Sequence, residues 1–281
     1  MGRFTQWVKR YTQRFLQVGP VTHSPQGEPQ MIAAGWESYA KNWQPKQFDV
    51  LEGHQVQHLG DEWTAEDISA NGSTTYGLES AIVLNFDQYL QHHLLDPYLP
   101  PHAVEGLEIG PGGGRLTDLL LPRTQILHVI DASATMLAHL QKRFAHDQSL
   151  RYYHTDGYTL PSLSPGSLDY AIALDVFVHF EPRLIFWYLR QIASLLKPGG
   201  VGIVHYANLL TPIGWTQFSL DLEANFQSRQ GFAAFGVMCP PIMAQFLTQL
   251  NLEIVSLDLG LFPRDAVTVF RRSPAMLHPV G

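Results

Sequence analysis

Apolar residues change their spacing near Pro101, and this change divides the chain into two parts. Before Pro101 they recur every three or four residues, as on one face of a helix, over about 1–18, 30–43 and 78–95. After it, short apolar runs alternate with longer helical patterns. Pro97, Pro100 and Pro101 mark the boundary, because proline interrupts helices. We expect a mainly helical N-terminal cap over 1–101 and a second domain over 102–281.

The second part predicts a sheet whose strands alternate with helices. Such a succession favours parallel strands, since each helix carries the chain back across a face of the sheet. We therefore expect the α/β class, with a doubly wound, mostly parallel seven-stranded sheet, helices on both faces and a less regular insertion at about 207–238. The expected strands cover 107–109, 126–131, 150–154, 167–174, 201–205, 252–258 and 265–271, and the expected helices cover 114–121, 133–144, 182–196 and 240–250.

A glycine-rich turn follows the first of these strands, where residues 106–115 read GLEIGPGGGR. Glycine allows a sharp turn and the close approach of a ligand, and the free N–H groups of the helix that follows favour a negative group. A dinucleotide-binding loop places its third glycine three residues after the second, and Arg115 occupies that position. Here Gly110, Gly112 and Gly114 fall at every second position, which disfavours a nicotinamide-dependent dehydrogenase.

This spacing, with Glu108 two residues before the first glycine, resembles the first motif of the class I S-adenosylmethionine (SAM)-dependent methyltransferases. Further pieces of the family pattern follow in order. Asp131 ends the second expected strand, Asp156 follows the third and Asp175 lies beyond the fourth, and Leu-Lys-Pro-Gly-Gly at 196–200 precedes the fifth. The resemblance covers about 104–271 and implies a Rossmann-like domain, S-adenosyl-L-methionine as cofactor and methyl transfer as activity.

The resemblance also implies roles for individual residues around the cofactor. Asp131 would bind the ribose and Asp156 the adenine amino group. Arg115 would either pair with the SAM carboxylate or face solvent. The other implied positions are Glu108, Gly110, Gly112 and Gly114 at the amino-acid end, Ala132 and Met136 beside the adenosine, Gly157 and Tyr158 around the adenine ring, and Asp175 and Val176 near the methionine.

Candidate catalytic residues lie at the ends of the fourth and fifth strands, because ligands of open α/β sheets bind outside the carboxyl ends. His179 follows the fourth strand, and His205 and Tyr206 lie at the end of the fifth. Either histidine could act as a general base, since histidine titrates near neutral pH. The alternative is a hydrogen-bonded structural histidine. A carbon, sulfur or deprotonated amine acceptor would need no base.

The cap and the insertion are expected to cover this edge of the sheet and to shape the acceptor pocket. Aromatic and polar residues of these segments are the candidate walls, and core packing is the alternative role for each of them. The candidate pocket residues are Trp63, Tyr76, Asn208, Trp215 and Phe218.

Charge and local sequence favour a small-molecule acceptor, methylated on oxygen or nitrogen. The formal net charge is −7, whereas proteins that bind nucleic acid usually carry a basic surface. Amino-methylating enzymes of nucleic acids often show Asn/Asp-Pro-Pro-aromatic after the fourth strand, and this chain has Asp-Val-Phe-Val at 175–178. The alternatives are a nucleic-acid or protein methyltransferase and a non-catalytic SAM-binding regulatory protein.

Other features predict little further chemistry. Cys239 is the single cysteine, and His54 and His58, although spaced to share a helix face, have no acidic third ligand at helical spacing, so we expect no metal. No apolar run could span a membrane and the sequence shows no signal peptide, so we expect a cytoplasmic location. We also expect a monomer or a homodimer. The stripe at 1–18 favours packing on protein over contact with a membrane surface.

Overall fold

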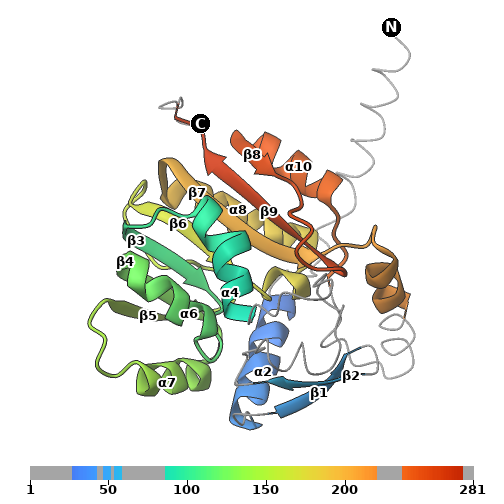
Figure 1. Ribbon diagram of the computed structural model, residues 1–281, viewed down its shortest axis with the longest axis horizontal. Coiled ribbons are helices and arrows are strands. Elements are labelled where there is room, and N and C mark those ends of the chain that lie inside the picture. The colour runs from blue at the N-terminus through green and yellow to red at the C-terminus, as the bar shows by residue number, and fades with distance from the viewer. Residues whose placement is uncertain (1–26, 43–46, 52–53, 59–85, 220–235, 275–281) are drawn as a thin grey trace, which may run out of the picture.

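The computed structural model describes residues 27–42, 47–51, 54–58, 86–219 and 236–274 (Figure 1). The predictions made for the helix at 1–18, for Trp63 and for Tyr76 lie outside these residues. Within the described ranges, no helix combines the length and the apolar character needed to cross a membrane.

A seven-stranded sheet forms the centre of the molecule, with the order β5-β4-β3-β6-β7-β9-β8. Strands β3 to β7 are parallel, and β9 is antiparallel to both β7 and β8. This arrangement confirms the mostly parallel sheet expected from the sequence. The strands are β3 (Ala103–Ile109), β4 (Thr124–Asp131), β5 (Leu150–His154), β6 (Leu168–Ala173), β7 (Leu196–Ala207), β8 (Leu252–Ser256) and β9 (Asp265–Arg272).

Helices cover both faces of the sheet (Figure 1). One face packs on α4 (Phe86–Leu90), the π-helical segment η2 (Gln91–Leu95), α6 (Arg115–Leu120) and α7 (Ala134–Arg143). The other packs on α8 (Pro182–Leu195) and α10 (Pro240–Gln249). In α8, Leu184, Ile185 and Tyr188 are buried at the spacing of one helix face, so the pattern that predicts the helix also fixes the side that it buries.

The expected cap of α7 is confirmed. Ser133 has an extended backbone, and its Oγ accepts a hydrogen bond from the N–H of Met136 at 3.0 Å. That bond satisfies one of the N–H groups left free in the first turn of a helix. It fixes the start of α7 directly after Asp131, the last residue of β4.

The N-terminal part departs from the expected helical cap. Helix α2 (Gly27–Asn42) matches the helix expected at 30–43, but β1 (Gln47–Leu51) and β2 (His54–His58) form an antiparallel pair. His54 and His58 therefore lie on a strand and not on one face of a helix. Residues 47–50 alternate between polar and apolar, which is the period of a strand, and the register then pairs β2 with this segment.

The helix expected at 78–95 extends further than predicted. In its described part, α4 and η2 run directly into α5 (Asp96–Tyr98), so the helical chain passes through Pro97. Proline is tolerated there because it lies in the first turn of α5, where an N–H group lacks a helical partner in any case.

Candidate active site

The carboxyl ends of the five parallel strands meet at one edge of the sheet, and this edge carries most of the predicted site residues. Because β9 is antiparallel to β7, its first residue, Asp265, reaches the same edge and pairs in register with Ala207. Residues at or just beyond the ends of β6, β7 and β9 therefore form a cluster at this edge.

The glycine loop has the backbone geometry of a ligand cradle. Gly110, Gly112 and Gly114 have φ angles of 68°, 53° and 93°, in the left-handed region that other residues rarely adopt. A Cβ atom placed on Gly110 would lie 2.3 Å from Cγ2 of Val176, so the loop and the segment after β6 touch without intervening space. Gly114 is the N-cap of α6 and packs against Leu140 of α7. Gly110 and Gly114 therefore require glycine for both conformation and space.

Glu108 lies beneath the loop and is only 1% exposed. Its Oε2 accepts a hydrogen bond from Oγ1 of Thr117 at 2.7 Å. Burial raises the pKa of Glu108 to about 8, although the hydrogen bond from Thr117 acts in the opposite direction. The carboxyl group is therefore largely protonated at neutral pH.

Two aspartates follow neighbouring strands, as predicted. The Oδ1 atom of Asp131 accepts the N–H of Ser133 at 2.8 Å. Oδ1 of Asp156 accepts the N–H groups of Tyr158 and Thr159, both at 2.9 Å. Burial raises the pKa of Asp156, but these hydrogen bonds outweigh burial and hold the pKa below its usual range. Both groups are thus charged acceptors at this edge.

Helix α8 holds the turn after β5, a contact that the sequence does not predict. The carbonyl oxygen of Tyr158 accepts from Nε1 of Trp187 at 2.9 Å and from Nε2 of Gln191 at 2.8 Å. Oε1 of Gln191 accepts the N–H of Leu160 at 2.9 Å. Gly157 lies inside this turn with a φ of 85°. The turn predicted to hold adenine is therefore braced from α8.

Helix α2 is anchored at the same edge. Oε2 of Glu37 accepts from Oγ of Ser133 at 2.8 Å, and Oε1 of Glu37 accepts from Oγ1 of Thr135 at 2.6 Å. These hydrogen bonds lower the pKa of Glu37 to about 2. Met136, in the same first turn of α7, is buried, and Ala132 just before it is half-buried. The contact joins the N-terminal part to the predicted adenosine side.

Asp175, His205 and Asp265 form a connected charged cluster. Oδ1 of Asp175 lies 2.9 Å from Nδ1 of His205, and Oδ2 of Asp265 lies 3.2 Å from Nε2. Arg115 approaches Asp175 from the glycine loop, with 4.0 Å between Nη2 and Oδ2. Since the Arg115 side chain is only 6% exposed, the alternative in which it faces solvent is wrong.

The surroundings of His205 change its predicted role. Burial lowers its pKa, but the carboxylates of Asp175 and Asp265 outweigh burial and raise the pKa of His205 to about 9. With this pKa the imidazole carries both protons at neutral pH. The ring is only 1% exposed, so this charge is enclosed within the protein. A general base needs a free lone pair within reach of the acceptor, so these surroundings favour a structural or positioning role for His205 over the predicted catalytic one.

His179 has the opposite protonation state. It lies in the short helix η4 (Phe177–His179), and its ring meets that of Trp36 edge to face, with 5.1 Å between centroids. Burial lowers the pKa of His179 to about 4, against the nearby charge of Asp175. The imidazole is therefore neutral near pH 7 and can accept a proton.

Two further predicted residues take part in the fold. Tyr206 is fully buried, and its hydroxyl contacts Oγ1 of Thr268 at 3.0 Å. Successive strand residues point to opposite faces, so Tyr206 lies on the other face of β7 from His205, and this packing favours a structural role over the predicted catalytic one. Asn208 is also buried, and its Oδ1 accepts the N–H of Leu210 at 3.1 Å. It shapes the turn before the helix at 212–219.

Trp215 and Phe218 lie on that helix with 5.5 Å between their ring centroids. Trp215 is 57% exposed, so it is available to a ligand or to another part of the chain. Their predicted place in an acceptor pocket stays a prediction.

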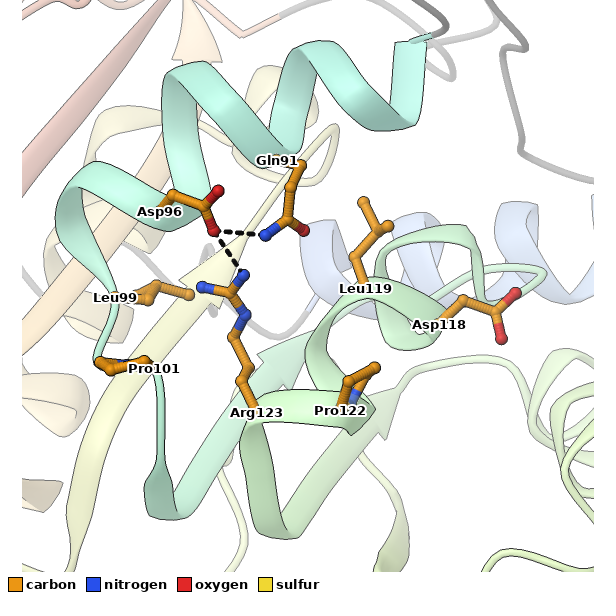
Figure 2. A pocket seen from close by; sticks show the side chains of 8 residues that line it. All are labelled: Gln91, Asp96, Leu99, Pro101, Asp118, Leu119, Pro122 and Arg123. Carbon is orange, nitrogen blue, oxygen red and sulfur yellow. Dashed lines mark hydrogen bonds and ion pairs between the residues drawn. The ribbon is translucent and has the colours of Figure 1, made fainter.

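A separate cavity of about 430 Å³ lies at the opposite end of the sheet (Figure 2). It is lined in part by Pro101, before β3, and by Arg123, before β4. Nη2 of Arg123 donates to Oδ1 of Asp96 at 2.8 Å across it. Because these residues mark the amino ends of the strands, the cavity is distinct from the glycine loop.

Asp265, Arg264, Phe262 and Gln191 are site residues that the sequence analysis missed. The Phe262 ring stacks on His205, with 4.4 Å between centroids and 25° between planes. A usable signal exists for Asp265, because a charged pair at 264–265 directly precedes a mostly apolar run at 266–270. Gln191 carries no such signal within its helical pattern.

Comparisons with known proteins agree with this geometry. Residues 107–201 match a family model described as a methyltransferase domain. A comparison with curated proteins found no match. Among solved structures, the PH0226 protein from Pyrococcus horikoshii OT3 is 18% identical with a TM-score of 0.51, covering 70% of this chain and 94% of that one. An O-methyltransferase family protein from Burkholderia thailandensis is 18% identical with a TM-score of 0.52, covering 68% of this chain and 58% of that one.

The fold, the glycine loop and the matched domain define one class of protein. Residues 107–201 carry a methyltransferase domain, and SAM is the cofactor that this domain implies. The residues present fit this cofactor, since the loop offers a glycine cradle at Gly110 and charged acceptors at Asp131 and Asp156 on the neighbouring strands.

Proposed function

We propose that this enzyme methylates an oxygen or nitrogen atom of a small-molecule acceptor by in-line displacement. The observation that carries the proposal is the contact between the glycine loop and the segment after β6. Val176 closes against Gly110, while the neighbouring Asp175 keeps 45% of its side chain exposed. A cofactor cradle and an open polar group thus adjoin each other, as methyl transfer to a polar acceptor requires.

We assign the cofactor positions from this arrangement. Asp131 would bind the ribose hydroxyls with its carboxylate, and Asp156 and Gly157 would hold the adenine. Arg115 would reach the carboxylate at the amino-acid end. When bound, SAM supplies a methyl group on a positively charged sulfur, which makes alignment the main task of the protein.

His179 is the proposed base where the acceptor must lose a proton. It adjoins the same edge, is neutral near pH 7 and lies beside Trp36 of α2. A ring nitrogen of His179 would take the proton that the acceptor atom loses, while the methyl–sulfur bond of SAM would break and leave S-adenosylhomocysteine.

A small acceptor is favoured over nucleic acid by the formal net charge of −7, because phosphate contacts need basic surface. The sequence at 175–178 also lacks the Pro-Pro pair of the amino-methylating enzymes that act on nucleic acids. A non-catalytic SAM-binding protein is the alternative from another class. Cytoplasmic location and a monomeric or homodimeric state remain predictions.

Calorimetric titration with SAM, S-adenosylhomocysteine (SAH) and NADH is the first test. We expect micromolar binding of SAM and SAH and none of NADH. Candidate hydroxyl and amine metabolites are then incubated with SAM and screened for the mass gain of one methyl group. Transfer to RNA or to protein but to no metabolite would contradict the proposal, and binding without any transfer would favour the regulatory alternative.

A further inference from the structure

Asp175 has an unusual backbone conformation at the edge of the cofactor cradle. Its φ is 57°, in the left-handed region, which is unfavourable for a residue other than glycine. Such a conformation persists only where the surroundings impose it. Asp175 follows β6 directly after Leu174, so this conformation decides where its carboxylate points.

His205 holds Asp175 by both its backbone and its side chain. When Nδ1 of His205 is protonated, it faces Oδ1 of Asp175 at 2.9 Å as an ion pair. When Nδ1 is unprotonated, the backbone N–H of Asp175 donates to it, with 3.1 Å between the nitrogens. His205 therefore constrains Asp175 in either state, but only a ring protonated at Nδ1 can donate to the carboxylate, and the cationic ring attracts it most strongly.

Asp265 holds His205 from the other side. In the antiparallel pair of β7 and β9, His205 is opposite Val267, so Asp265 is its diagonal neighbour two residues along. Asp265 is itself fixed by Arg264, whose Nε donates to Oδ1 at 2.7 Å. The Phe262 ring lies over the imidazole, and an aromatic face attracts a cation.

We propose that His205 and Asp265 form a positioning pair that fixes the Asp175 carboxylate between the cofactor cradle and the acceptor. The pair itself touches neither ligand, since the His205 ring is enclosed and the Asp265 side chain is 4% exposed. This inference rests on the proposed function, because it assumes that Asp175 lines the methyl-transfer site.

Charge on neighbouring elements supports this role. Arg115 of α6 also lies near Asp175, and Arg264 pairs with Asp265. Each carboxylate is therefore shared between His205 and one arginine. Loss of the imidazolium would leave the Asp175 carboxylate with its ion pair to Arg115, at 4.0 Å and from the side of the glycine loop.

The first test measures the proton on His205 without any ligand. Isotope-labelled histidine is titrated by nuclear magnetic resonance, and the His205→Gln variant identifies the signal. We expect His205 to titrate near pH 9 in the wild type. In Asp265→Asn, which removes one carboxylate and keeps the shape, it should titrate at least about one pH unit lower. Titration near the ordinary pKa of a free histidine in the wild type would overturn the proposal.

The second test measures SAH affinity by calorimetry at neutral pH. We expect His205→Gln and Asp265→Asn to bind SAH about tenfold more weakly, because relaxation of the strained Asp175 backbone competes with binding. Asp265→Glu keeps the charge and should stay within about threefold of the wild type. Unchanged affinity in both of the first two variants would overturn the proposal.

Asp169→Asn is the matched control. Asp169 lies near the amino end of the same strand, β6, and pairs with Lys197 at 2.6 Å. Its replacement should lower the thermal midpoint but leave SAH affinity and the His205 titration unchanged. If the wild type binds SAH and shows the expected titration but methylates no acceptor, the proposed function fails while the positioning pair stands.

Discussion

Gly110 and Val176 lie so close together that a Cβ atom on Gly110 would be 2.3 Å from Cγ2 of Val176. Real Cβ atoms do not approach this closely, so Gly110→Ala must displace the segment after β6. The φ of 68° adds backbone strain. We expect this variant to lose measurable SAH binding in calorimetry and to be destabilised by about 1–3 kcal/mol in urea unfolding.

Gly199→Ala separates strain from steric clash. Gly199 has a φ of 80°, and a Cβ atom added to it would have no neighbour within 4 Å, so alanine there meets strain but no clash. It should be destabilised by about 1–2 kcal/mol and bind SAH as the wild type does. Equal SAH affinity in Gly110→Ala would show that the loop does not contact the cofactor.

The sequence predicts the elements of this fold well where local signals agree. β5 has the expected bounds, Leu150–His154, and Ser133 caps α7 as its position indicates. Both depend on short-range physical effects, namely strand alternation and the free N–H groups of a first turn. The glycine loop is equally local, because its spacing is visible without any partner.

The cluster around His205 could not be predicted, because it depends on strand direction. A strand at 265–271 is visible in the sequence, but nothing local shows that it runs antiparallel to β7 and brings Asp265 to the carboxyl edge. The opposite orientations of His205 and Tyr206 depend on which face of β7 each side chain occupies. The position of the Arg115 side chain could not be predicted either, because it depends on the ion pair with Asp175, which is distant in the sequence.

Asp131→Ala is expected to weaken SAM binding by about 100-fold or more, since it removes a charged acceptor of the ribose hydroxyls. Asp147→Ala is a close control, because Oδ1 of Asp147 accepts the N–H of Ser149 at 2.8 Å, as Oδ1 of Asp131 does from Ser133. Calorimetry should show wild-type affinity in the control. Retained affinity in Asp131→Ala would reject the ribose assignment.

Glu108 should make folding stability depend on pH. Its folded pKa of about 8 lies above its ordinary value of 4.5, so the folded state keeps a proton that the unfolded state releases. Stability is then greatest below about pH 4.5 for this group and falls by at most about 1.4 kcal/mol per pH unit as the pH rises toward 8. Glu108→Gln should flatten that decline in urea unfolding, and an unchanged slope would show that the carboxyl group is ionised when folded.

Thr117→Val tests the cause of that pKa. It removes the hydroxyl that donates to Oε2 of Glu108 at 2.7 Å and lowers the pKa. Without this hydrogen bond the folded pKa should rise further, so the decline in stability should continue to a higher pH than in the wild type. A decline that ends at a lower pH would contradict the role of Thr117.

His179→Gln should separate proton transfer from cofactor binding. If His179 is the base, kcat with an oxygen acceptor should fall by about 100-fold, while SAH affinity stays within about threefold of the wild type. Because burial lowers the pKa of His179 to about 4, the wild-type rate should not lose this base between pH 6 and 8. Trp36→Phe keeps an aromatic ring against His179 and should leave kcat nearly unchanged. An unchanged kcat in His179→Gln would show that the acceptor is already deprotonated when it meets the methyl group.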